Sequence, residues 1–101
     1  MAPRMPESVQ QFETRFRAAA ARGDTEIRFG LHHYSHAIVR EGDTWSVRPL
    51  ELDRAKADAY RAEHKMFMPE HAEMLSEPGP TAVFAGTLDQ VIAKLPSIWP
   101  R

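Results

Sequence analysis

The sequence predicts a single α+β domain spanning residues 1–101, with its elements in the order α-β-β-β-α-(α)-β-α. A length of 101 residues leaves room for one domain. Amphipathic helix patterns lie near both ends of the chain, and an alternating apolar and polar pattern lies between them. We expect a three-stranded meander and a strand at 81–85 to form one antiparallel or mixed sheet, with the helices packed on one face.

The first predicted helix begins after Ser8 and ends at Gly23. Ser8 and Gln11 have the spacing of a capping box, in which their side chains accept hydrogen bonds from free backbone amides of the first turn. Gly23 can take the left-handed conformation that often ends a helix. Between Ser8 and Gly23, four apolar residues at helical spacing predict a buried stripe: Val9, Phe12, Phe16 and Ala19.

Residues 25–49 predict strands. Ile27, Phe29 and Leu31 alternate with other residues, the pattern blurs over 32–35, and it resumes through 37–39 and 45–47. We favour two strands with a turn at 32–35, and one long bulged strand over 25–40 is the alternative. Residues 41–43 supply a hairpin connection, and a proline at 49 is expected to end the last strand.

A long helix is predicted over 51–67, with a buried stripe made mostly of alanine. The stripe consists of Leu52, Ala55, Ala59, Ala62 and Met66. Pro69 interrupts this helix and can begin a short second one over 69–75, because proline is well tolerated as the first helical residue.

The last third of the chain predicts a loop, a strand and a helix. Residues 76–80 are rich in proline and glycine, and 81–85 form a short apolar run expected to be an interior strand. Thr87 and Gln90 form a second capping box, Pro96 is expected to stop the helix, and the tail with Trp99 should dock. The predicted core comprises Phe12, Phe16, Phe29, Trp45, Val83, Phe84, Val91, Ile92 and Leu95.

Composition excludes several classes of function. There is no cysteine, and the net charge of −1 argues against nucleic-acid binding. No apolar run approaches the roughly 20 residues of a membrane span, and the first residues do not resemble a secretory signal, so a cytoplasmic protein is expected. The segment 51–77 carries seven acidic and four basic residues, which would suit a basic partner. The abundance of alanine and arginine is typical of a bacterial protein.

The five histidines are the residues best suited to proton transfer or metal binding. They lie in two segments, as His32, His33 and His36 and as His64 and His71. If 32–36 were extended, His32 and His36 would share a face and could bind a metal with His64 or His71. The alternative is a polar turn without a ligand, which we favour because no recognised zinc spacing is present. Ser35 should point away from its neighbours, so no catalytic pair is assigned, and no enzyme activity or cofactor is expected.

The segment 64–74 concentrates methionine, histidine and glutamate. His64, Met68 and His71 at helical spacing could hold copper(I), but packing or an adaptable contact surface is the interpretation we favour. At least one of residues 66–68 should then be exposed. The residues assigned to this candidate binding surface are Tyr34, His36, His64, Met66, Phe67, Met68, Glu70, His71 and Glu73.

A short meander flanked by helices resembles, in its architecture, bacterial immunity proteins and antitoxins. The resemblance implies a small module, or an accessory factor, that occupies the surface of another protein. The alternative is a small metal- or ligand-binding protein, or a minor enzyme, that uses the histidines. Self-association into a homo-oligomer is a further alternative.

Overall fold

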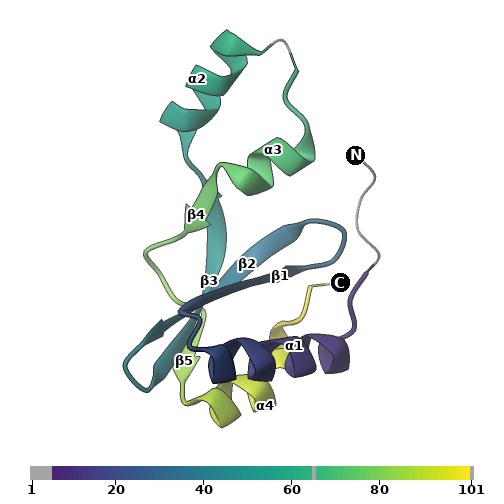
Figure 1. The fold of residues 1–101 in the computed structure, drawn as a ribbon, viewed down its shortest axis with the longest axis vertical. Helices are drawn as coiled ribbons and strands as arrows, with labels where there is room; N and C mark the ends of the chain where they lie inside the picture. The colour runs from purple at the N-terminus through teal and green to yellow at the C-terminus, as the bar shows by residue number, and fades with distance from the viewer. Residues whose placement is uncertain (1–5, 65, 101) are drawn as a thin grey trace.

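A computed structural model describes residues 6–64 and 66–100, without the side chains of residues 69 and 70. The domain is α+β, and its elements follow nearly the predicted order (Figure 1). The elements are α1 (Val9–Arg22), β1 (Glu26–Gly30), β2 (Tyr34–Glu41), β3 (Thr44–Leu52), α2 (Arg54–Glu63), α3 (Pro69–Met74), β4 (Ser76–Pro78), β5 (Phe84–Gly86) and α4 (Leu88–Ile98).

All strand pairs of the five-stranded sheet are antiparallel. The order is β1-β2-β3-β4, and β5 also pairs with β3. The two predicted strands of 25–40 are confirmed, with residues 31–33 as their connection. The predicted hairpin is also confirmed, since Gly42 has a φ of 61° between β2 and β3. The meander therefore follows from alternation and one turn glycine.

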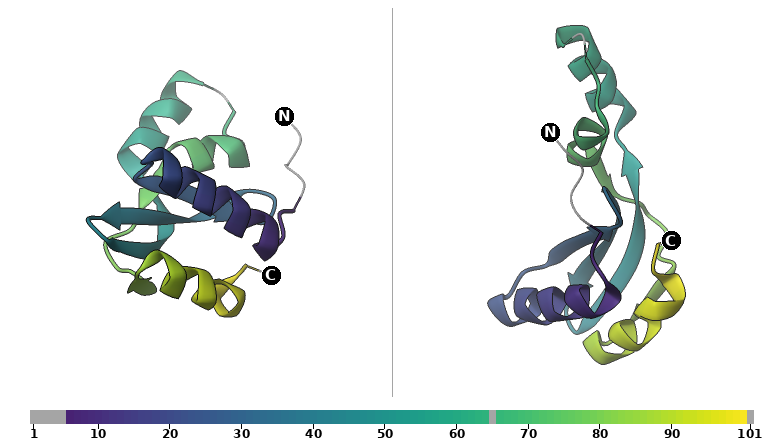
Figure 2. Two further views of the ribbon diagram at one scale, coloured as in Figure 1. Left: turned by 60° about the horizontal axis from the view of Figure 1, so that its bottom comes forward. Right: turned by 90° about the vertical axis from the view of Figure 1, so that its right-hand side faces the viewer.

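The main hydrophobic core lies between one face of the sheet and the helices α1 and α4. Phe12 and Phe16 of α1, Val91 and Leu95 of α4, and Val47 of β3 are fully buried in it. The left view of Figure 2 shows α1 and α4 running across the sheet side by side. Burial of three phenylalanines, each worth about 1.5–3 kcal/mol, makes this region the main source of stability.

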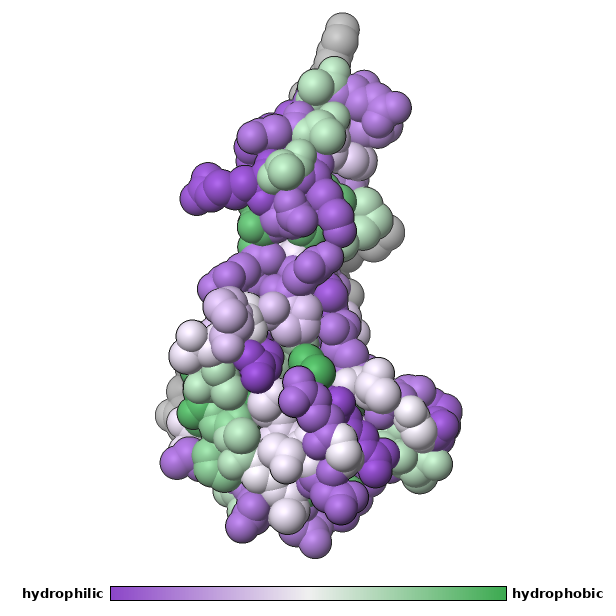
Figure 3. All heavy atoms as spheres, turned by 90° about the vertical axis from the view of Figure 1, so that its left-hand side faces the viewer, coloured by the Kyte–Doolittle hydropathy of each residue, from purple (hydrophilic) through white to green (hydrophobic). Residues whose placement is uncertain are grey.

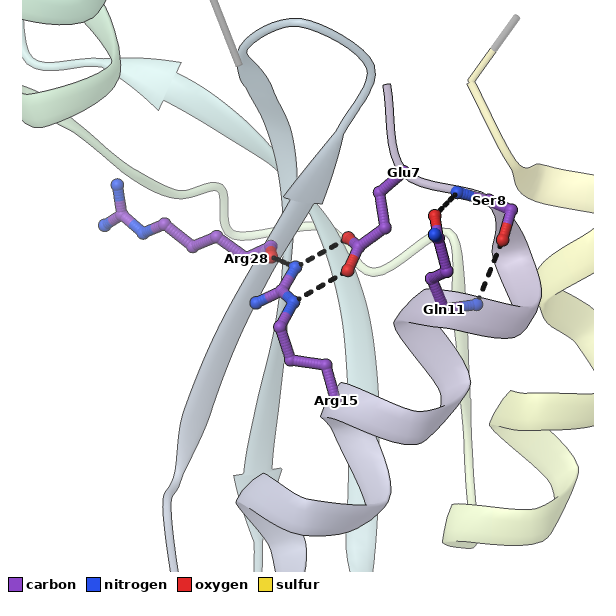
Figure 4. A network of polar contacts seen from close by, with 5 residues as sticks. All are labelled: Glu7, Ser8, Gln11, Arg15 and Arg28. Atoms are coloured by element: carbon purple, nitrogen blue, oxygen red, sulfur yellow. Dashed lines mark hydrogen bonds and ion pairs between the residues drawn. The ribbon is translucent and has the colours of Figure 1, made fainter. Parts of the chain in front are cut away.

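The first helix is fixed to the sheet at its beginning and along its length. Ser8 and Gln11 form the predicted capping box, and Gly23 ends the helix with a φ of 87°. Arg15 donates to both carboxylate oxygens of Glu7 at 3.0 Å and to the backbone oxygen of Arg28 at 2.8 Å (Figure 4). One guanidinium thus joins the segment before the helix, the helix itself and β1.

The helices α2 and α3 stand away from this layered part of the molecule. They follow β3 and precede β4, and the right view of Figure 2 shows α2 projecting beyond the end of the sheet. The molecule is accordingly elongated, with extents of 43 × 28 × 25 Å. We call residues 54–74, with both helices and the segment between them, the arm, and the sheet with α1 and α4 the body.

The predicted long helix over 51–67 is wrong in its bounds and in its buried face. The helix covers only Arg54–Glu63, and Asp53 caps it by accepting from the amide of Lys56 at 3.0 Å. Ala57 is the only residue of this helix that is fully buried. The predicted stripe at Ala55, Ala59, Ala62 and Met66 is exposed. Alanine burial depends on what lies next to the helix, which the periodicity does not specify.

Pro49 does not end β3, which continues to Leu52. The backbone oxygen of Pro49 accepts from the Gly79 amide, on the side of β3 that pairs with β4 and β5. Residue 49 lies between those two pairings, so no strand on that side needs a hydrogen bond from its backbone nitrogen. A missing amide costs nothing at that point. Because β3 continues, Ser76–Pro78 can pair with it as β4, although a loop was predicted there.

Two further predictions near the C-terminus need correction. An interior strand was predicted at 81–85, but the strand covers only 84–86 and, among the described strands, pairs with β3 alone. Val83, predicted to be in the core, is 51% exposed. Phe84 and Ile92 are only partly buried beside the core. The helix α4 continues through Pro96 to Ile98, because a proline in the last turn removes only one hydrogen bond. Trp99 docks as predicted, 5.4 Å from Phe12 and 5.1 Å from Phe29 between ring centroids.

Candidate functional site

The arm carries most of the exposed bulky apolar side chains of the described residues. Met66 and Met74 are each 63% exposed and Met68 is 38% exposed, whereas Phe67 is half-buried. In the space-filling view, pale-green apolar residues run along the upper part of the molecule between purple charged ones (Figure 3). The expected exposure in 66–68 is confirmed. Methionine on a surface is a flexible, polarisable contact residue.

A small aromatic cluster holds the two helices of the arm together. The ring of Tyr60 lies 4.2 Å from His64, 4.8 Å from His71 and 6.2 Å from Phe67 between centroids. The guanidinium of Arg61 covers the Phe67 ring at 4.3 Å. Aromatic pairs of this kind contribute about 0.5–1.5 kcal/mol each. The two histidines of the arm therefore have packing roles around one tyrosine.

His71 also fixes the start of α3. Its Nδ1 accepts a hydrogen bond from the Met68 amide at 2.9 Å, just before Pro69 begins the helix. A ring nitrogen can accept only when it carries no proton. Nδ1 of His71 is therefore the acceptor of this bond, which sets the direction in which the chain leaves residues 66–68.

The base of the arm is held by a row of residues across the second face of the sheet. Arg28, Ala37 and Arg48 lie side by side on β1, β2 and β3. Arg28 donates to the backbone oxygens of Glu73 and Ser76, each at 3.0 Å. Arg48 donates to those of Gly79 and Pro80 at 3.1 and 2.7 Å. Ala37 is fully buried between them. Its small side chain leaves space for the aliphatic parts of the two arginine side chains.

The carboxylate of Glu73 connects the arm with the turn between β1 and β2. It accepts from the backbone amide of Tyr34 at 3.2 Å and lies 3.6 Å from Nδ1 of His33. Only 14% of the Glu73 side chain is exposed. Tyr34 lies in turn under the guanidinium of Arg15, which is 5.7 Å from its ring centroid. Tyr34 and Glu73, both assigned to the binding surface from the sequence, are thus brought together at the base of the arm.

A surface ion pair joins α2 to β4. Nζ of Lys56 lies 2.9 Å from the carboxylate of Glu77, and this hydrogen bond raises the pKa of Lys56. Both side chains are more than half exposed, so the pair contributes little to stability.

His36 lies apart from the arm, on the face of the sheet that α1 and α4 cover. Its ring stacks on Phe29 at 5.1 Å, and burial lowers the pKa of His36. Contrary to our expectation, the adjacent Ser35 does not point away, and its hydroxyl lies 2.8 Å from Nδ1 of His36. The physical reason is the register shift between Phe29 and Gly30, where an irregularity in the β1–β2 ladder interrupts strict alternation. Within the described residues no carboxylate contacts this pair, so no third catalytic member is in place.

The structure divides the residues of the candidate surface into three groups. His64, Met66, Phe67, Met68 and His71 belong to the arm, Tyr34 and Glu73 lie at its base, and His36 belongs to the body. The side chain of Glu70 lies outside the part that the structure describes. Among the described residues, no three histidine or acidic side chains converge as ligands for a metal ion, so the combination of His32 or His36 with His64 or His71 is not assembled.

Sequence reasoning missed the two arginines at the base. Arg28 binds residues 45 and 48 positions away in the chain, and such pairings leave no local pattern. The only signal was an arginine at a strand position next to a small residue on the neighbouring strand.

Comparisons with known proteins give no guide to this site. No protein-family model matches the chain, and neither the curated proteins nor the solved structures give a significant match. In the described part of the chain, no helix has both the length and the apolar character that crossing a membrane requires.

Proposed function

We propose that this chain is a small protein-binding module that uses the arm to occupy the surface of a partner, as immunity proteins, antitoxins and accessory factors do. The observation that supports this is the position of the exposed methionines. Met66, Met68 and Met74 lie on a projecting element and are 63%, 38% and 63% exposed. Exposed apolar surface that is rimmed by polar residues often marks a site of protein–protein contact.

The charges around the methionines indicate the chemistry of the partner. Asp58 and Glu63 are exposed on α2, with 77% and 80% of their side chains accessible. Arg54, Lys56 and Arg61 of the same helix are also exposed, so an apolar centre with a rim of mixed charge fits a partner whose own apolar patch has a mixed charged rim. The alternative, a metal- or ligand-binding function for the histidines, gains no specific observation, because the histidines are divided between the arm, its base and the body.

The proposal is tested by affinity purification from the native host with three matched baits. The double variant Met66→Glu, Met74→Glu should lose the partner that the unchanged chain retains. The variant Val83→Glu is the control, because Val83 is an exposed apolar residue of the body. Equal recovery with all three baits would exclude the arm as the contact surface. Recovery of only a second copy of the chain would replace the proposal with self-association.

A further inference from the structure

An open groove of about 460 Å³ lies in the body, at the end farthest from the arm. Its walls are the C-terminal half of α1, the β2–β3 hairpin and the first turn of α4. It shares no residue with the arm, so what it binds does not depend on the function proposed above.

Arg40 is held in a fixed position on the hairpin side of this groove. Its Nε donates to the backbone oxygen of Gly42 at 2.8 Å, and its guanidinium lies over the Trp45 ring at 5.3 Å. Trp45 is itself only 4% exposed and packs edge-on against Phe16 at 5.1 Å. A guanidinium fixed by stacking loses little conformational freedom when it binds a ligand.

Within the described part of the chain, the two terminal nitrogens of Arg40 have no hydrogen-bond acceptor. Among the described residues, no carboxylate lies within 4.0 Å of them, although most other arginines of the body contact one or bind backbone oxygens. Arg17, on the opposite wall, is already engaged with Glu13 at 3.3 Å and Asp89 at 3.5 Å. Arg40 is therefore the cation of the groove that is available to a ligand.

The remaining lining is small and apolar. Ala20 and Leu88 are half-buried and Ala21 is exposed, so the floor beside Arg40 can accept an aliphatic side chain without steric conflict. Asp43 lies on the rim and would repel an anion weakly. The groove is open to solvent, which suits a chain segment laid across it better than a small molecule that needs enclosure.

We propose that this groove binds a peptide segment of a partner protein in which an aspartate or glutamate is next to an aliphatic residue. The carboxylate accepts two parallel hydrogen bonds from the terminal nitrogens of Arg40, the geometry in which arginine binds carboxylates most strongly. The neighbouring aliphatic side chain lies over Ala20 and Leu88.

The first test measures fluorescence anisotropy of a labelled, amidated peptide with one glutamate between two leucines, and of its glutamine analogue. The glutamate peptide should bind at least about tenfold more tightly, because it alone supplies a charged acceptor. Arg40→Gln should abolish that difference. Arg54→Gln, the same change at the other end of the molecule, should leave it intact.

A second pair of variants tests the proposal without changing Arg40, whose loss could also disturb the hairpin. Ala21 is exposed on α1 at the groove, so Ala21→Glu and Ala21→Lys change its charge at similar size without opening the core. Binding of the glutamate peptide should weaken with glutamate and strengthen with lysine, and Asp43→Asn should strengthen it too. Equal binding of the two peptides, no binding of either, or an equal effect of both Ala21 variants would overturn the proposal.

Discussion

The body and the arm are stabilised by different means. In the body, two helices close over one face of the sheet, and aromatic rings from α1, β1, β3 and the C-terminal tail are in contact. In the arm, Ala57 is the one fully buried residue of α2, and the helices depend on one tyrosine, their caps and the arginines at the base. The contrast indicates that the body supplies most of the stability and that the arm, with few buried residues, contributes less.

The largest expected effect comes from the core of the body. Phe16→Ala should lower the free energy of unfolding by about 3–5 kcal/mol, because it opens a cavity at a fully buried site. Met66→Ala in the arm should change it by less than about 0.5 kcal/mol. Urea titrations of both variants measure the difference, and similar midpoints for the two would contradict the conclusion that the body supplies most of the stability.

The connection between the two regions is tested by Arg28→Ala. The loss of two hydrogen bonds from a charged donor should cost about 1.5–3 kcal/mol. Arg22→Ala is the matched control, because its ion pair with Asp24 is exposed and should contribute less than about 1 kcal/mol. Amide hydrogen exchange should increase in α3 and β4 for the first variant only. Unchanged protection there would show that the β3–β4 ladder alone holds the arm.

How far the sequence predicts each region follows from this contrast. The starts of α1 and α4 could be predicted because capping boxes at Ser8 and Thr87 are local, and each was found as expected. The hairpin at Gly42 is equally local. For the arm, apolar spacing predicted a helix, but the buried face was wrong, because Ala57 and not Ala59 is covered by neighbouring elements.

The base of the arm could not be predicted, for a related reason. At the base of the arm, Arg28 and Arg48 bind backbone oxygens, which every residue has, so the sequence does not mark these partners. The strand β4 depends on continuation of β3 past Pro49, and local proline rules oppose that continuation. The exposure of at least one of residues 66–68 was predicted because more apolar bulk was present than a helix end needs, and Met66 and Met68 are exposed.

A third variant separates the stability of the arm from that of the body. Tyr60→Ala removes the ring that contacts His64, Phe67 and His71. Each of these ring pairs should contribute about 0.5–1.5 kcal/mol to the free energy of unfolding of the arm. Tyr60→Phe keeps the ring and serves as the control. Exchange should increase in α2 and α3 of the alanine variant while β1 and β2 keep their protection. Equal loss of protection in both regions would mean that arm and body unfold as one unit.

The smallest expected effect is a pH dependence that belongs to the body. Burial lowers the pKa of His36 below its ordinary value of 6.5, so between these two values the unfolded chain binds a proton that the folded chain does not. The free energy of unfolding should therefore be highest above about pH 6.5, fall as the pH drops through this window, and level off below the folded-state pKa. His36→Phe keeps a ring against Phe29 and should remove this part of the dependence. Unfolding titrations from about pH 8 to about pH 5 measure the difference between the two proteins. The same pH dependence in both proteins would show that it does not come from His36.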